Sequence, residues 1–461
     1  MGKVLITTLG CKVNQADSES IAAAYISKGF SLVKKGERPD VCIVNTCTVT
    51  AKADKECRGE IRKLKKLYPM AKVIVTGCYA NVSADELQKM PEADEVVGTL
   101  PLVLSLSKDE TLMVRQAHHE RAKKSRPQLK IQDGCNNFCA YCIVPYARGR
   151  SRSVPPEEVV SRVSELRDAG FKEVVLTGIH VGGYGADLEP KTTLVELLRG
   201  LCHSEPEGRR IPQDPSLSLR MTSDSTHNDT HFRIRLSSID PDEWDDAIMD
   251  HVCPHFHIPL QSGDDEILRA MGRKYTTEDY RKLIEGIAIR GSQRSDIRSQ
   301  IFPTSDLRPL ASSPAIGADV IVGFPGETDD HFERTKNFVS SLPLTYLHVF
   351  PYSRRKLTAA ANLKETVPDP VKAERADILR KISEKKRFDF YKSFIGKTVR
   401  VVVEMKRDRR TGLLKGVSEN YIPVLFEGDD RLMAKIVTVE IEGVNGDHVT
   451  GNHILGSGLT S

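Results

Sequence analysis

The first hundred residues alternate short β-branched runs with stretches of helical periodicity. Apolar runs occur at residues 4–8, 41–44 and 73–75, and helical patterns occur near 18–27 and 51–67. Strands that alternate with helices in this way are typical of a parallel sheet covered by helices. We therefore expect residues 1–100 to form an α/β domain.

A second alternating series begins near Leu129. Its strand-like runs are "LKIQDGC", "EVVLTG", "RIRLSSI", "HFHIPL", "GADVIVGFPG" and "YLHVFPYS", and helical patterns separate most of them. Six βα-type units predict a partial (β/α)6 barrel over residues 128–370, with its active site at the carboxyl ends of the strands. Two polar tracts with weak periodicity, near 200–231 and 291–314, are predicted to be exposed insertions or disordered loops.

The remaining segments predict two connectors and a third domain. Residues 101–127 indicate a polar helical linker, and residues 371–390 a linker helix. After Tyr391, short apolar runs punctuated by Gly and Asp predict a small antiparallel β-barrel over 391–455. The expected fold class is thus α/β, with three domains. His118 and His119 in the first linker make a poor metal pair, because adjacent residues point to different faces of a helix.

The composition is that of a globular protein of more than one domain. The chain has 461 residues, of which 39% are hydrophobic and 28% charged. We find no apolar run long enough to span a membrane and no signal-peptide pattern, so we expect a cytoplasmic protein without membrane contact. In that compartment, ten cysteines indicate metal or redox chemistry more often than disulfides.

The net charge of +4 is too small to identify a polyanionic partner, but basic residues concentrate between Lys372 and Lys415. A solvated helix face followed by a basic turn is one explanation of this run. The other is RNA binding, because small β-barrels often bind oligonucleotides. In that case the segment "KRDRR" contacts the RNA backbone through Lys406, Arg407, Arg409 and Arg410.

Three cysteines follow the three N-terminal strands, namely Cys11, Cys47 and Cys78. The carboxyl ends of parallel strands share one edge of the sheet, where open α/β folds bind ligands, so these cysteines should converge. Their small neighbours Gly10 and Gly77 allow the backbone to turn sharply. The alternative is three core cysteines, which is the role we expect for Cys42 inside its strand.

The stretch "CNNFCAYC" places Cys135, Cys139 and Cys142 on one short loop. Three thiolates can hold three irons of a cubane cluster, and without a fourth cysteine nearby one iron stays open for a ligand. A zinc site usually has two cysteine pairs, and a thioredoxin-like pair would leave Cys135 without a role, so both alternatives fit less well.

Small and polar residues follow the other barrel strands, at the edge where a cofactor is expected. These candidate cofactor-binding residues are Thr177, Gly178, Ser237, Gln261 and Gly323.

At the "CNNFCAYC" loop the chain resembles the radical S-adenosylmethionine (SAM) enzymes. That resemblance implies a 4Fe–4S cluster at the end of the first barrel strand, whose open iron chelates SAM. One-electron reduction then cleaves SAM to a 5′-deoxyadenosyl radical. The resemblance also places Tyr141, the aromatic residue before the third cysteine, near the adenine of SAM.

The stretches "TLGCKVNQADSE", "VNTCTVT", "VTGC" and "KIQDGCNNFCAYCIVPYARGRSRS" together are similar to the methylthiotransferases, above all to the subgroup that modifies threonylcarbamoyladenosine in transfer RNA. The resemblance implies that Cys11, Cys47 and Cys78 hold a second 4Fe–4S cluster, which handles the sulfur. It also implies that the C-terminal barrel is a TRAM-like RNA-binding domain.

The reaction implied by this resemblance replaces C2–H of an adenosine with C2–S–CH3. The implied substrate is N6-threonylcarbamoyladenosine at position 37 of the tRNA anticodon loop, with electrons from a flavodoxin or ferredoxin system. Arg148 and Arg150 in "YARGR" suit phosphate or the carboxylate of the threonylcarbamoyl group, or else a structural ion pair. Alternative targets are isopentenyladenosine in tRNA and an aspartate of a ribosomal protein, and a non-catalytic RNA-binding iron–sulfur protein is a further alternative.

Overall fold

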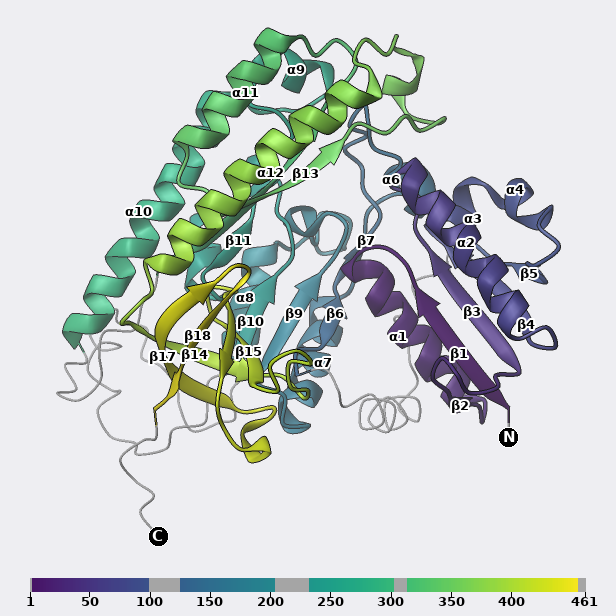
Figure 1. Ribbon diagram of the computed structural model, residues 1–461, viewed down its shortest axis with the longest axis horizontal. Helices are drawn as coiled ribbons and strands as arrows, with labels where there is room; N and C mark the ends of the chain where they lie inside the picture. The colour runs from purple at the N-terminus through teal and green to yellow at the C-terminus, as the bar shows by residue number, and fades with distance from the viewer. Residues whose placement is uncertain (1, 99–124, 204–231, 302–312, 455–461) are drawn as a thin grey trace.

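The computed structural model describes residues 2–98, 125–203, 232–301 and 313–454 (Figure 1). The first linker, with His118 and His119, lies almost wholly outside these residues, as do most of both predicted insertions. No helix in the described part of the chain combines the length and apolar character needed to cross a membrane.

The N-terminal domain is a parallel five-stranded sheet, as predicted, with strand order β2-β1-β3-β4-β5. Its strands are β1 (Lys3–Thr8), β2 (Ser31–Leu32), β3 (Val41–Thr46), β4 (Lys72–Gly77) and β5 (Glu95–Val96). Its helices are α1 (Lys12–Ser27), α2 (Ala51–Leu67), α3 (Cys78–Val82) and α4 (Ala84–Gln88). The core between α2 and the sheet contains Cys42, Ile61 and Leu64, so the expected core role of Cys42 is confirmed.

The central region contains two parallel three-stranded sheets, ordered β10-β9-β6 and β11-β12-β13. Their strands are β6 (Gln128–Lys130), β9 (Glu173–Thr177), β10 (Arg233–Leu236), β11 (His255–His257), β12 (Ala315–Val322) and β13 (Tyr346–Pro351). A hydrogen bond of 3.0 Å from Ile239 N to His257 O joins β10 and β11 beyond their ladders. The six strands therefore curve into the predicted partial barrel.

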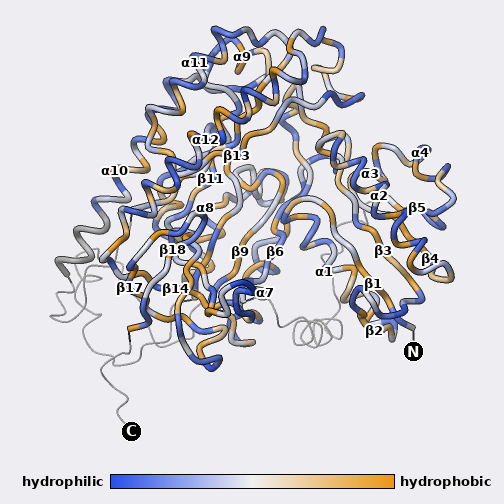
Figure 2. Tube along the Cα trace, in the orientation of Figure 1, coloured by the Kyte–Doolittle hydropathy of each residue, from blue (hydrophilic) through white to orange (hydrophobic). Residues whose placement is uncertain are grey.

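Helices cover the outside of this barrel. They are α7 (Pro156–Asp168), α8 (Leu194–His203), α9 (Asp265–Ala270), α10 (Thr277–Ile301), α11 (Asp329–Ser341) and α12 (Asp369–Lys392). Shorter elements near the first strand are β7 (Gln132–Asp133), α6 (Val144–Arg148) and β8 (Arg152–Ser153). The 3₁₀ helices are η1 (Val181–Gly183), η2 (Pro241–Glu243), η3 (Asp246–Asp250), η4 (Ala359–Asn362) and η5 (Asp430–Leu432). Figure 2 shows the hydrophobic residues running along the strands beneath these helices.

Two connectors differ from the expectation. The prediction of a loop from residue 291 is wrong for residues 291–301, because α10 continues to Ile301. This tract contains Ser, Arg and Gln but no proline before Pro303, and polar residues extend a helix that is already formed. The predicted linker helix is α12, which packs on β13 and places Ala376 and Leu379 in the barrel core. It is therefore an outer helix of the barrel as well as a connector.

The C-terminal region closes into the predicted small barrel, with order β14-β15-β16-β18-β17. Its strands are β14 (Thr398–Val403), β15 (Leu414–Ser418), β16 (Pro423–Phe426), β17 (Ile436–Asn445) and β18 (His448–His453). All neighbours are antiparallel except β16 and β18. Tyr391, at the end of α12, and Phe394 belong to its core, so α12 contributes to two domains.

The N-terminal domain spans the open side of the partial barrel. At one edge α1 lies along β6, where Asp17 pairs with Lys130 and Gln15 accepts a 3.1 Å hydrogen bond from Gln128. Beyond β13, at the other edge, Arg355 contacts Asp54 at 2.7 Å. Because β6 and β13 are the outer strands of the two sheets, this docking encloses the barrel interior between the domains.

We predict that Arg355→Met weakens this docking. Asp54 and Arg355 have side chains only 12% and 9% exposed, so the substitution leaves a nearly buried carboxylate without its cation. Breaking such a pair costs about 3 kcal/mol or more. Differential scanning calorimetry should show the first unfolding transition at a lower temperature than in the wild type.

Lys52→Met is the matched control. Lys52 lies on α2, the helix that carries Asp54, and forms an exposed ion pair with Glu56. Its loss should cost less than about 1 kcal/mol. Equal transitions for the two variants would contradict the assigned role of Arg355.

Candidate active site

The structure brings Cys11, Cys47 and Cys78 together at one edge of the N-terminal sheet. Cys47 and Cys78 directly follow β3 and β4, whose last residues are aligned in register. Gly10 turns the chain after β1 with φ of +111°, and a Cβ there would lie 2.8 Å from Cys47 Cβ. Only glycine therefore lets Cys11 approach Cys47 so closely.

Arg148 and Asn14 link Cys11 with Cys78 in this first triad. Asn14 Oδ1 lies 3.4 Å from Cys11 Sγ and accepts a 2.9 Å hydrogen bond from Arg148. The Nε of Arg148 donates to Cys78 Sγ at 3.2 Å. Burial raises the pKa of the Cys78 thiol to about 12, and the nearby Arg148 opposes that rise. Metal loading must therefore displace a proton from this sulfur.

Arg148 is a structural residue, which corrects its predicted contact with substrate. Its side chain is 1% exposed, and it forms ion pairs with Asp133 at 3.0 Å and Asp17 at 2.8 Å. With the bonds to Asn14 and Cys78, all three of its nitrogens are engaged. The ion-pair alternative therefore holds for this arginine.

The second triad lies on the loop between β7 and α6. Gly134 has φ of +72°, and a Cβ there would lie 2.0 Å from Arg150 O. The side-chain amide of Gln132 donates to Gly134 O at 2.8 Å, and Cys135 N donates to Gly149 O at 3.1 Å. These two bonds fix the start of the loop against β7 and against the turn after α6.

A second buried arginine contacts this triad. Arg273 donates to Cys139 Sγ at 3.2 Å and to Asp240 at 2.7 Å. Each triad thus has one arginine that donates to a cysteine sulfur. Such N–H···S bonds stabilise thiolate charge and influence the reduction potential of a bound cluster.

The two triads occupy adjoining elements. Helix α6 begins two residues after Cys142 and carries Arg148, which reaches Cys78. It packs on α3, which begins at Cys78, and the side chain of Asn81 donates to Ala147 O. Figure 1 shows α6 beside α3, between the N-terminal sheet and the barrel.

The cysteine arrangement fits clusters better than single ions. Among the described residues, ligand atoms that all lie within 4.8 Å of one another belong to two histidine–carboxylate groups, and neither cysteine triad is among them. A zinc ion needs its ligands at this close spacing, whereas the irons of a cubane hold theirs further apart. All six cysteines are free thiols.

Two predicted cofactor-binding residues offer unsatisfied hydroxyls. Thr177 Oγ1 and Ser237 Oγ are buried and have no hydrogen-bond partner among the described residues. They follow Leu176 and Leu236, which are paired in register, so both lie at the same strand edge. An unsatisfied buried hydroxyl costs about 1–3 kcal/mol, so a polar ligand is expected here. The polar groups of SAM fit this requirement.

The other cofactor candidates shape the same edge. Gln261 and Gly323 have φ of +69° and +74°, and Gln261 O accepts a bond from Ile321 N at 2.9 Å. A Cβ on Gly178 would lie 2.9 Å from Gln132 Oε1, so this glycine gives the supporting side chain room. Tyr141 packs against a cluster that contains Met271 and Phe324. Their contact with a cofactor remains a prediction.

The sequence did not predict a polar group that consists of His180, Asp240 and Glu243 and lies beside the second triad. His180 lies 2.7 Å from Glu243, and Asn137, within the cysteine loop, contacts His180 at 3.0 Å and Asp240 at 3.2 Å. Burial alone would lower the pKa of His180, but the bond to Glu243 raises it above the ordinary value. Their position in the sequence could have indicated these residues, because His180 and Asp240 closely follow β9 and β10, at the end of the barrel where the active site is expected.

The predicted RNA-contacting residues differ in their surroundings. Arg407 pairs with Asp430 at 2.7 Å and donates to Gly412 O and Gly428 O, so it braces its own loop. Lys406, Arg409 and Arg410 are exposed on that loop, and Arg150 is exposed with its guanidinium 4.9 Å from the Phe138 ring centroid. Contacts of these residues with nucleic acid remain predictions.

Two family models match the chain. Residues 3–98 match the uncharacterized protein family UPF0004, and residues 129–339 match the radical SAM superfamily. The second match covers both the Cys135 loop and the strand edge with the unsatisfied hydroxyls. These features together define a radical SAM enzyme with an additional cysteine-bearing domain.

Relatives over the full length narrow this class. The chain is 36% identical to the threonylcarbamoyladenosine tRNA methylthiotransferase MtaB of Aquifex aeolicus, over 92% of this chain and 97% of that protein. It is 33% identical to the tRNA-2-methylthio-N(6)-dimethylallyladenosine synthase of Dictyoglomus thermophilum, over 96% of each. Among solved structures, the radical SAM methyltransferase TsrM of Kitasatospora setae covers 78% of this chain and 77% of its own, with 14% identity and a TM-score of 0.48. The chain belongs to the radical SAM tRNA methylthiotransferases.

We predict that each triad holds its own cluster. A variant with Cys135, Cys139 and Cys142 all changed to alanine should lose about half of the iron and sulfide, since one cubane of two remains. A variant with Cys11, Cys47 and Cys78 changed to alanine should lose the other half. Cys42→Ala is the control, because this buried cysteine belongs to the core and should leave the iron content unchanged. Loss of all iron from one triad variant alone would contradict independent clusters.

We predict that the two unsatisfied hydroxyls bind SAM. Thr177→Val and Ser237→Ala should each weaken SAM binding by about five- to tenfold, the value of one hydrogen bond. Equilibrium dialysis with the iron-loaded protein measures this. Ser340→Ala, on the exposed face of α11, is the control and should bind SAM as the wild type does. Unchanged affinity in both test variants would exclude the assignment.

Proposed function

We propose that this protein methylthiolates C2 of N6-threonylcarbamoyladenosine at position 37 of tRNA. The observation that carries the proposal is the contact of Arg148 with Cys78, because Arg148 lies on α6, the helix that begins two residues after Cys142. A reaction that inserts sulfur into a C–H bond needs a radical source and a sulfur carrier at the same substrate, and adjoining triads satisfy that requirement.

The bound groups supply the radical chemistry, the sulfur and the methyl group that turn C2–H into C2–S–CH3. The residues of the chain position these groups. Cys135, Cys139 and Cys142 hold one cluster, and Thr177 and Ser237 orient SAM at the strand edge. Arg148 and Arg273 stabilise negative charge on the two sets of sulfurs. The docked N-terminal domain limits access of water, which protects a radical from side reactions.

The substrate and partners follow from the third domain and from the reaction. The C-terminal barrel, with exposed Lys406, Arg409 and Arg410, suits the phosphate backbone of an anticodon stem. The cluster held by the second triad requires a one-electron donor, and a flavodoxin or ferredoxin system in the cytoplasm would provide it. Because two groups of relatives act on different adenosines, the N6 substituent is the point that an assay must decide.

The test is an anaerobic assay with the iron-loaded protein, SAM, a reductant and one tRNA prepared in two forms. One form carries threonylcarbamoyladenosine at position 37 and the other carries dimethylallyladenosine. We expect nucleoside mass spectrometry to show the 2-methylthio product from the first form and little from the second. Methylthiolation of the dimethylallyl form alone would refute the proposed substrate.

Failure with both forms, despite full iron loading and release of 5′-deoxyadenosine, would refute tRNA methylthiolation itself. A protein aspartate would then be the target to examine.

A further inference from the structure

All three domains meet at a layer of aromatic and charged side chains inside the partial barrel. Lys12 comes from the N-terminal domain, Tyr421 from the C-terminal barrel, and His255 and Tyr346 from the first residues of β11 and β13. His255 stacks on Tyr421 with ring centroids 4.4 Å apart and bonds to the hydroxyl of Tyr346 at 2.9 Å. The candidate cofactor-binding residues follow the carboxyl ends of the barrel strands, whereas His255 and Tyr346 lie at the amino ends. This layer therefore forms the floor of the enclosed space.

Strand alternation shows that these side chains face the interior. Phe256, Ile316 and Leu347 belong to the core beneath the outer helices. The residues next to them along each strand must point to the opposite side of the sheet. His255 and Tyr346 therefore face inward, where they can meet Lys12 and Tyr421 from the other two domains.

Three cations surround the ring of Tyr421. Arg235 lies 5.1 Å, Arg126 5.6 Å and Lys12 5.8 Å from the ring centroid. Arg235 is paired with Glu173 at 2.8 Å, and Arg126 contacts Glu173 at 3.8 Å and Glu404 at 3.6 Å. The two arginines thus have two carboxylates between them, so the unbalanced positive charge of the three cations is that of Lys12.

Lys12 is the cation of this group without an anion. Within the described part of the chain, no carboxylate lies within ion-pair distance of its ammonium group, and no side-chain hydrogen bond of Lys12 is found. Its side chain is partly buried, and it immediately follows Cys11, whose thiol is exposed. An ammonium removed from water without a partner is costly, so an anionic ligand is expected to complete the site.

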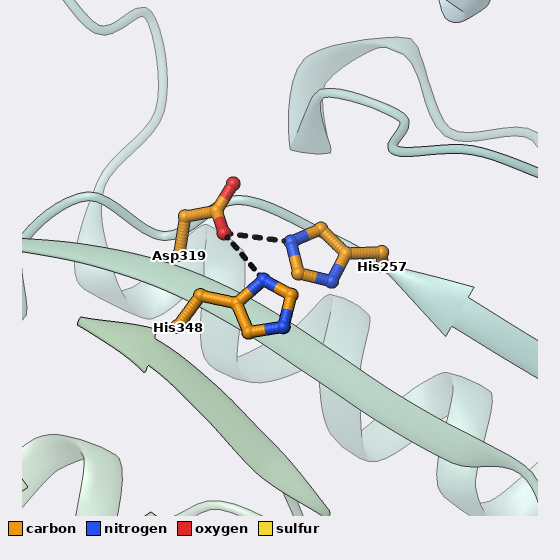
Figure 3. A group of neighbouring side chains, drawn as sticks. All are labelled: His257, Asp319 and His348. Carbon is orange, nitrogen blue, oxygen red and sulfur yellow. Dashed lines mark hydrogen bonds and ion pairs between the residues drawn. The ribbon is translucent and has the colours of Figure 1, made fainter. Parts of the chain in front are cut away.

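A further acidic side chain of the interior, Asp319, already has partners of its own. Asp319 Oδ1 accepts bonds from both His257 at 2.9 Å and His348 at 3.3 Å (Figure 3). Both imidazoles converge on the same oxygen, so this carboxylate already has its partners within the group. Asp319 therefore remains with its histidines, and the charge of Lys12 is available to a ligand.

We propose that Lys12 binds the carboxylate of the N6 substituent of the target adenosine and so selects an acidic substituent over an apolar one. This inference rests on the proposed function. C2 and C6 of adenine flank N1 on one edge of the base, so the N6 substituent and the reacting carbon lie on the same side. A substituent held by Lys12 would then keep C2 close to the triad that begins with Cys11. An apolar dimethylallyl group would leave the ammonium unpaired.

The experiment measures binding of three synthetic anticodon stem-loops to the iron-loaded protein with SAM. They carry threonylcarbamoyladenosine, its methyl ester, or dimethylallyladenosine. The wild type should bind the free acid at least about tenfold more tightly than the ester, because a charge-assisted bond is lost. Lys12→Met should bind the acid as weakly as the ester, and Lys12→Arg should retain most of the preference.

Lys28→Met is the matched control. Lys28 follows the other end of α1, and its ammonium lies 5.9 Å from the Tyr25 ring centroid, but it is exposed. This variant should behave as the wild type. Iron content should be equal in all four proteins, which separates recognition from cluster assembly.

The outcomes distinguish this inference from the proposed function. An acid-over-ester preference that persists in Lys12→Met overturns the role of Lys12, even if the wild type modifies the tRNA. No preference in the wild type also overturns it. A preference that depends on Lys12, in a wild type that forms no thiomethyl product, supports the recognition site while refuting the proposed reaction.

Discussion

The buried guanidinium of Arg148 is the interaction on which the active centre depends. It joins segments from two domains, namely Asp17 and Asn14 on α1, Asp133 on β7 and Cys78 at the start of α3. The planar fork of arginine can satisfy these partners simultaneously, whereas a lysine ammonium could not reproduce the geometry. The same residue therefore balances two buried carboxylates, supports a cysteine sulfur and aligns the cysteine loop of the barrel with the N-terminal sheet.

The convergence of the N-terminal cysteines could be predicted because parallel strands in register must end at one edge. Cys47 and Cys78 illustrate this, since both directly follow paired strands. The closed C-terminal barrel and the six central strands were predictable for a similar reason, because alternation and turn residues are local signals. The helical course of residues 291–301 was not recognised, since its polar residues are compatible with both a helix and a loop.

The partners of charged side chains could not be predicted from the sequence. Arg148 was an equally good candidate for substrate or for an ion pair until Asp17 and Asp133 were found beside it. The group formed by His180, Asp240 and Glu243 likewise depends on the approach of two separate loops. Pairings of this kind are set by tertiary packing, and a pattern along one strand or helix carries no information about them.

Helix α12 contributes Ala376 and Leu379 to the core of the central barrel and Tyr391 to the core of the C-terminal barrel. A single continuous helix anchored at both ends acts as a rigid strut between the two. The distance between the loop that carries Lys406, Arg409 and Arg410 and the cysteine loop of the central barrel is thereby fixed. In the proposed function, this fixed distance determines which nucleotide of a bound stem-loop can reach the active site, because only one nucleotide lies at that distance from the residues that hold the RNA backbone.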